Sequence, residues 1–93
     1  MSLQQAIQAT ERTLVDVREI HEFEMGHAPG AINIPLSVIQ GKVDDILSYS
    51  TPVVLYCRSG MRSGQALEFL KAMGAKDIYN GGGLEDVLAL MNG

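Results

Sequence analysis

Apolar and polar positions follow two rhythms along the chain, which predict alternating strands and helices. Short apolar runs predict four strands, at residues 14–17, 31–34, 52–56 and 77–79. Apolar residues at helical spacing predict helices at 2–8, 37–47, 63–73 and 84–91, with a helical turn at 20–25. Proline and glycine punctuate the chain between these elements, and no internal repeat or linker is visible.

The strand predicted at 52–56 indicates the layer arrangement. Its residues lack the polar alternation of a half-exposed strand, so both of its faces should be buried, as in a parallel sheet. Strands that alternate with helices are typical of an α/β domain. We therefore expect a mostly parallel sheet of four or five strands with helices on both faces. The short N-terminal segment leaves open whether a fifth edge strand exists.

Composition narrows the function classes. The chain has 93 residues, and 7 Lys and Arg against 11 Asp and Glu give a net charge of −4. A chain of this size predicts one domain spanning residues 1–93. The acidic balance argues against a nucleic-acid partner, since phosphate binding needs a basic face. No apolar run approaches the ~20 residues of a membrane span, and the first residues do not resemble a signal peptide.

The single cysteine, Cys57, excludes an internal disulfide, so we expect a reducing, cytoplasmic location. The two histidines, His21 and His27, are dispersed, and no metal cluster is expected. We expect His27 to cap or pack a turn.

Cys57 is also the first residue of the segment that we consider the strongest candidate for a reactive site. In parallel sheets, ligands bind outside the carboxyl ends of the strands, and Cys57 directly follows the most apolar strand. The next residues are the candidate substrate-binding loop: Arg58, Ser59, Gly60, Met61 and Arg62. Small and polar residues let the backbone curl, and N–H groups at a helix start lower a thiol pKa. The alternative is that Cys57 is only a small buried hydrophobic residue.

Each loop residue has an expected role. Arg58 and Arg62 would bring two positive charges to an anionic substrate. Met61 would form an apolar lip at the pocket mouth. Asp16 and Arg18 lie at the end of another strand, at the same edge, and could shape the pocket entrance, although an ion pair that fixes the chain is the favoured interpretation. Ser63 is a further supporting residue at the loop end.

Four segments give the chain its resemblance to the rhodanese family of single-domain sulfurtransferases. They are Leu14–Glu19, Glu22–Pro35, Val54–Ser63 and Asn80–Gly83, in the family order. The resemblance implies a rhodanese-like fold and a catalytic role for Cys57. Cys57 would take a sulfane sulfur from an anionic donor such as thiosulfate, and the persulfide would then pass sulfur to cyanide or a cellular thiol. No cofactor or metal is implied. Val87 stands where the family commonly has Trp.

Two other functions stay open at this point. A persulfide carrier or interaction module would share the loop but act with a protein sulfur acceptor. Phosphatases that resemble this fold have a Cys-x5-Arg loop, whereas Cys57 and Arg62 enclose four residues. The smaller ring favours a single sulfur over a phosphate. We expect the Gly81–Gly83 run to form a tight turn.

Overall fold

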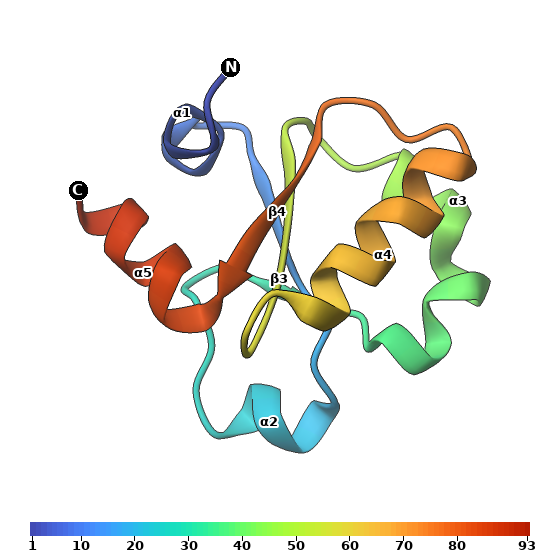
Figure 1. The fold of residues 1–93 in the computed structure, drawn as a ribbon, viewed down its shortest axis with the longest axis horizontal. Coiled ribbons are helices and arrows are strands. Elements are labelled where there is room, and N and C mark those ends of the chain that lie inside the picture. Colours follow the sequence, from blue (N-terminus) through green and yellow to red (C-terminus); the bar gives the residue numbers. More distant parts are fainter.

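The computed structural model describes residues 1–93 and contains helices on both sides of one sheet (Figure 1). The strands are β1 (Thr13–Asp16), β2 (Ile32–Asn33), β3 (Val53–Cys57) and β4 (Ile78–Gly83). The helices are α1 (Leu3–Gln8), α2 (Ile20–Glu24), α3 (Val43–Leu47), α4 (Met61–Ala72) and α5 (Leu84–Asn92), with a 3-10 helix, η1, at Leu36–Lys42. No helix has the length and apolar character needed to span a membrane.

All four strands are parallel and lie in the order β2-β1-β3-β4. The predicted α/β class with a parallel sheet is therefore confirmed, and the number of strands is four. Since the strands run in one direction, their carboxyl ends meet at one edge. The ends of β1 and β3 bring Asp16 and Cys57 to this edge, together with the glycine-rich end of β4.

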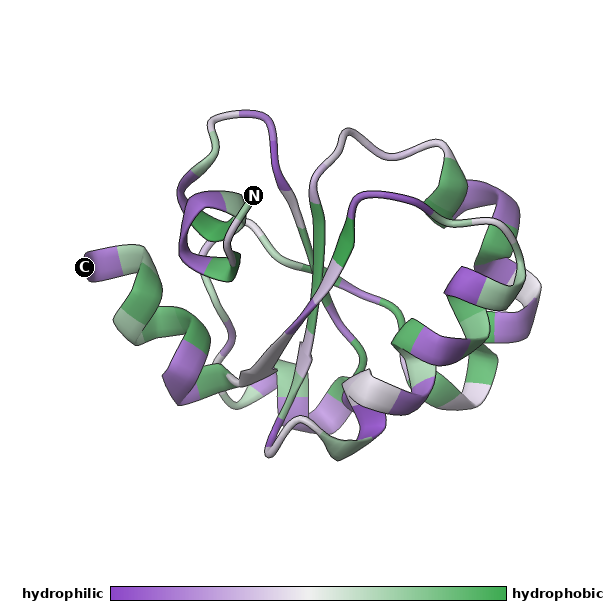
Figure 2. Ribbon diagram, turned by 45° about the horizontal axis from the view of Figure 1, so that its top comes forward, coloured by the Kyte–Doolittle hydropathy of each residue, from purple (hydrophilic) through white to green (hydrophobic).

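Side chains of β3 alternate between two hydrophobic cores, which explains its unbroken apolar sequence. Val53, Leu55 and Cys57 belong to the core beneath α3 and α4. Val54 and Tyr56 point to the other core, which α1 and α5 cover. Every residue of β3 is buried. In Figure 2 the central strands carry much of the hydrophobic colour, whereas the helices alternate between hydrophobic and hydrophilic residues.

Two of the predicted helices differ from the structure, one by an internal break and the other by its first residue. The single helix predicted at 37–47 is wrong, because the segment is η1 followed by the short α3. Gly41 weakens helical continuity, and Lys42 leaves helical geometry with φ −119° and ψ 11°. The helix predicted from Ser63 begins two residues earlier, at Met61, because Gly60 takes a left-handed conformation directly before it.

The expected tight turn at Gly81–Gly83 is also wrong, since these residues extend β4 to Gly83. A bulge lies there: Leu55 pairs with Asn80, but Cys57 pairs with Gly83. Three steps along β4 thus match two along β3. Gly82 adopts φ +87°, which accommodates the extra residue.

Candidate functional site

Cys57 is the last residue of β3, and the chain turns through three residues into α4. Gly60 ends this turn with φ +97°, a conformation that L side chains rarely adopt. A Cβ on Gly60 would also lie 3.2 Å from the Cα of Gly82. The sequence therefore needs glycine here for two reasons: backbone conformation and the close approach of β4.

The loop directs hydrogen-bond donors at the Cys57 sulfur. The Gly60 N–H donates to Sγ at 3.0 Å, and the Ser63 Oγ lies 3.4 Å from the same atom. The sulfur is fully buried, and burial by itself raises the pKa of the Cys57 thiol. Hydrogen bonds from the Ser63 side chain and from the N–H groups of Ser63, Ser59 and Gly60 outweigh burial and lower the pKa to about 7. A substantial thiolate fraction therefore exists at neutral pH.

β4 braces the loop from the side. Asn80 Nδ2 donates to the Gly60 carbonyl at 3.1 Å, and its Oδ1 accepts from Ser63 Oγ at 2.7 Å and from the Gly82 N–H at 3.0 Å. A Cβ on Gly83 would overlap the Arg58 carbonyl oxygen, so only glycine fits there. The bulged end of β4 thus fixes the shape of the loop.

The two loop arginines differ in their surroundings. Arg62 forms an ion pair with Glu22 of α2, with Nη1 to Oε1 at 2.7 Å and Nη2 to Oε2 at 3.0 Å. The bidentate contact with Arg62 lowers the pKa of Glu22 to about 2. Arg58 is exposed and forms no ion pair. Both arginines lie at the loop, but the charge of Arg62 is compensated by Glu22, whereas Arg58 has no carboxylate partner.

Asp16 and Arg18 form the ion pair that the structural interpretation predicts. Asp16 is fully buried, Arg18 is 7% exposed, and their Nη2–Oδ2 distance is 2.8 Å. Arg18 also donates to the Gly26 carbonyl and lies 5.8 Å from the centre of the Tyr56 ring. The pair thus anchors the segment that leads from β1 into α2. His27 stacks on Phe23 of the α2 end, as expected for a turn-packing residue.

A cavity of about 600 Å³ lies beside the loop, between α2 and the start of α5. Its lining residues are Arg18, His21, Glu22, Met25, Arg58, Leu84 and Glu85. Cys57 does not line this cavity and has no exposed surface. Met61, at the start of α4, is 75% exposed and is not one of the residues that line this cavity.

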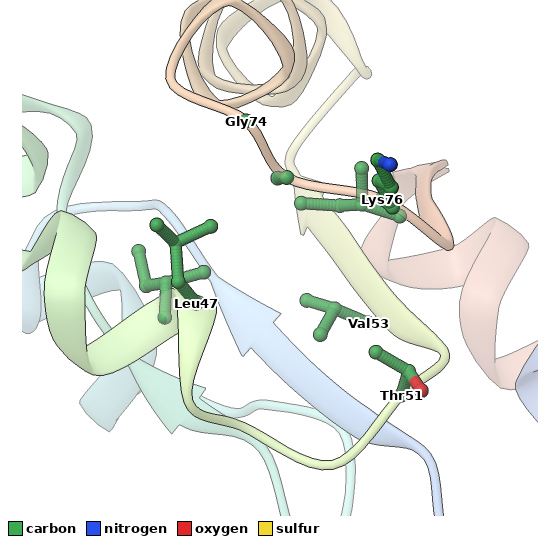
Figure 3. A pocket seen from close by; sticks show the side chains of 8 residues that line it. Leu47, Thr51, Val53, Gly74 and Lys76 are labelled. Atoms are coloured by element: carbon green, nitrogen blue, oxygen red, sulfur yellow. The ribbon is translucent and has the colours of Figure 1, made fainter.

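A second cavity, of about 320 Å³, lies at the opposite end of the sheet (Figure 3). Val53 at the start of β3 and Ile78 at the start of β4 line it, together with Leu47 and Lys76. Parallel sheets bind ligands at the other edge, where Cys57 lies, and Cys57 does not line this cavity. No cluster of three or more His, Cys, Asp or Glu side chains is arranged to hold a metal ion.

Sequence reasoning brought Cys57 and its loop together but missed Asn80 and Glu22 as site residues. Asn80 is 17 positions from Ser63, and Glu22 is 40 from Arg62. Both belong to segments that carry the family resemblance. Their side-chain partners, however, are set by the sheet order and the position of α2.

Comparisons with known proteins agree on the family. A sequence model of the rhodanese-like domain family matches residues 2–89. Thiosulfate sulfurtransferase PspE of Escherichia coli is 38% identical over 74 residues, covering 78% of this chain and 71% of PspE. YqhL of Bacillus subtilis is 48% identical over 67 residues, covering 72% of this chain. The matched segment spans 52%, about half, of YqhL.

Solved structures give the same result. The structure of a rhodanese with anions from E. coli superposes with a TM-score of 0.74 and 37% sequence identity. The match covers 81% of this chain and 89% of that one. Parallel topology, a cysteine-headed loop and these similarities define one class: the chain belongs to the rhodanese-like domain family.

Proposed function

We propose that the protein is a sulfurtransferase in which Cys57 carries sulfur as a persulfide. The observation that supports this most directly is the Gly60 N–H pointing at Sγ at 3.0 Å, in a loop that lowers the thiol pKa to about 7. The thiolate is the nucleophilic form of cysteine. Sulfurtransferases among the relatives, including PspE, support the same reaction class.

The proposed reaction has two displacements. The Cys57 thiolate attacks the outer sulfur of an anionic donor such as thiosulfate, the sulfur–sulfur bond of the donor breaks, and sulfite leaves with the bonding electron pair. An acceptor thiolate or cyanide then attacks the outer sulfur of the persulfide, and Cys57 leaves as a thiolate. The loop N–H groups at Ser59, Gly60 and Ser63 stabilise the negative charge in both steps.

Arg58 is the proposed contact for the anionic donor. It is the loop cation without a carboxylate partner, and it lines the cavity beside the loop. Ser59, Gly60 and Met61 complete the proposed substrate loop, and Arg62 holds it to α2. Asp16, Arg18 and Ser63 are proposed as supporting residues.

A persulfide carrier that serves a protein acceptor is the second candidate. Exposed apolar side chains favour it: Met25 in the cavity wall, just after α2, is 86% exposed, and Ile20 at the start of α2 is 59% exposed. Such residues suit contact with another protein surface. A carrier would load sulfur normally but turn over slowly with cyanide or small thiols. A cytoplasmic location is part of either proposal, since a free thiol persists where reductants are present.

Intact-protein mass spectrometry tests the proposal. Thiosulfate should add about 32 Da, one sulfur atom, and cyanide should remove it. Cys57→Ser is the matched control and should gain no mass. Full turnover by Cys57→Ser would exclude the persulfide route, and hydrolysis of an aryl phosphate in place of sulfur loading would indicate a phosphatase.

A further inference from the structure

The hydroxyl group of Ser63 lies between two hydrogen-bond acceptors. Its Oγ is 2.7 Å from Asn80 Oδ1 and 3.4 Å from Cys57 Sγ. A serine hydroxyl has one proton, so it donates to only one of these atoms at a time. Ser63 and Asn80 are both held in place, since Ser63 is fully buried and Asn80 is part-buried on β4.

The neighbours of Asn80 determine which end of its amide faces Ser63. Gly82 N–H donates to one amide atom and the Gly60 carbonyl accepts from the other, so the first is the oxygen and the second the nitrogen. Ser63 therefore faces an acceptor, and the short 2.7 Å distance places its proton on the Asn80 side. Toward Cys57 the hydroxyl then presents a lone pair, which suits a protonated thiol.

We propose that Asn80 is a positioning residue. Its Oδ1 accepts the hydrogen bond of the Ser63 hydroxyl while Cys57 is a thiol, and the hydroxyl donates to Sγ instead when Cys57 ionises. The step is a rotation about the Ser63 Cβ–Oγ bond, and no covalent bond to hydrogen in Ser63 breaks. The Cys57 proton itself leaves to solvent. Asn80 Oδ1 keeps the Gly82 N–H as a donor in both states, so it is never left without a partner.

This exchange of hydrogen bonds rests on the proposed function, because it would serve the sulfur-transfer cycle of Cys57. Negative charge on Sγ appears and disappears as the persulfide forms and breaks. When sulfur is loaded, the charge moves to the outer sulfur, and the Ser63 proton returns to Asn80. When the acceptor removes that sulfur, Sγ leaves as a thiolate and receives the Ser63 hydrogen bond again. Asn80 thus makes the stabilisation of Sγ available only when charge is present.

Other charged groups surround the thiol but do not contact this pair of residues. They are Arg62 on α4, Glu22 on α2, Arg58 in the loop, Asp86 on α5, Asp16 at the end of β1 and Arg18 after it. The charges of Arg62 and Glu22 compensate each other, as do those of Asp16 and Arg18. Asp86 accepts from the Gly83 N–H. None of them hydrogen-bonds to Ser63 or Asn80. Their influence on the Cys57 pKa should therefore be the same in variants of either residue.

A double-mutant cycle on the Cys57 pKa tests the proposal. The pKa is measured from the pH dependence of alkylation in four proteins: the unaltered chain, Ser63→Ala, Asn80→Ala and the double variant. Asn80→Ala loosens the loop in both backgrounds but frees the hydroxyl only where Ser63 is present. When Ser63 is present, the freed hydroxyl stabilises the thiolate. The change in Cys57 pKa caused by Asn80→Ala should therefore be more negative, by about half to one pH unit, in the Ser63 background than in the Ser63→Ala background. Equal shifts in both backgrounds would overturn the proposal.

Asn80→Asp provides a second cycle in case Asn80→Ala does not fold. The carboxylate keeps an acceptor for Ser63 and binds its proton more tightly, while its charge raises the Cys57 pKa in both backgrounds. The increase should be larger when Ser63 is present, and an equal increase would contradict the proposal. Both cycles measure ionisation without a sulfur donor. If the pKa shifts are equal in both backgrounds and Cys57 still takes up sulfur from thiosulfate, only this inference is overturned. If the shifts differ as expected but Cys57 takes up no sulfur, the proposed function is overturned.

Discussion

Glu22 of α2 and Arg62 of α4 face each other with two hydrogen bonds, although 40 positions separate them in the chain. Glu22 Oε1 also accepts from the Glu19 N–H at 3.0 Å, so one carboxylate joins the start of α2 to the loop that follows Cys57. This contact makes α2 part of the site. It also leaves Arg58 as the loop cation available to a substrate.

We predict that Glu22→Gln destabilises the protein in a pH-dependent way. The folded-state pKa of Glu22 is about 2, below its ordinary 4.5, so the carboxylate contributes stability above about pH 4.5 and loses it as pH falls toward 2. The pair is part-exposed, so the loss at neutral pH should be about 1 kcal/mol or less. Urea unfolding at several pH values measures this.

The difference in unfolding free energy between the two proteins should narrow as the pH falls from about 4.5 toward 2. Glu24→Gln on the same helix is the matched control, because Glu24 is exposed and forms no ion pair. A difference that stays constant with pH would show that the Glu22 carboxylate does not act through its charge.

We predict that Arg58→Ala raises the KM for thiosulfate roughly three- to tenfold and leaves kcat less affected, since one exposed charge contact is worth about 1 kcal/mol. Arg58 lines the cavity and has no carboxylate partner. Steady-state kinetics measure the effect. Lys71→Ala, at the far end of α4, removes an equal charge and should change neither constant. Similar KM increases in both variants would assign the effect to overall charge.

We predict that alkylation of Cys57 follows a titration with a midpoint near pH 7. Loop hydrogen bonds stabilise the thiolate more than burial opposes it, so the midpoint lies below the ~8.5 of free cysteine, which serves as the reference. A small reagent is needed because the sulfur is fully buried. A midpoint at or above that of free cysteine would mean that burial dominates and that the loop does not activate the thiol.

We predict that Gly83→Ala destabilises the protein by about 1–3 kcal/mol, because the new methyl group would overlap the Arg58 carbonyl oxygen. The loop must move to relieve the overlap, so sulfur loading should slow as well. Gly41→Ala is the control: nothing lies within 4 Å of its Cβ position, so the variant should be as stable as the unaltered protein or more stable by up to ~1 kcal/mol. Equal stability of the two variants would show that the contact between β4 and the loop is not tight.

The strands and most helices could be predicted because their apolar residues repeat with a clear period. β3 is an example, since its five buried residues encode a central strand on their own. The glycine run of β4 has no side chains to form a pattern, and its strand conformation comes from pairing with Cys57. The break between η1 and α3 likewise depends on backbone geometry at Lys42.

The candidate site divides in the same way. Cys57 and its loop are contiguous, so their composition alone pointed to a reactive thiol. The Asn80 contacts depend on the bulge in β4, and the pairing of Arg62 with Glu22 depends on where α2 lies. Neither is visible as a local pattern, because each joins segments that only the folded sheet brings together.

Cys57 belongs to the hydrophobic core beneath α3 and α4, together with Val53, Leu55, Ala66 and Leu70. This placement has a consequence for oxidative damage. Oxidation of Sγ to a sulfinic or sulfonic acid would add two or three oxygen atoms to a buried site whose loop donors are arranged around a single sulfur, so the oxygens would press into the adjacent aliphatic side chains, away from water. An irreversibly oxidised protein should therefore lose its packing as well as its nucleophile, and so become a substrate for proteolysis.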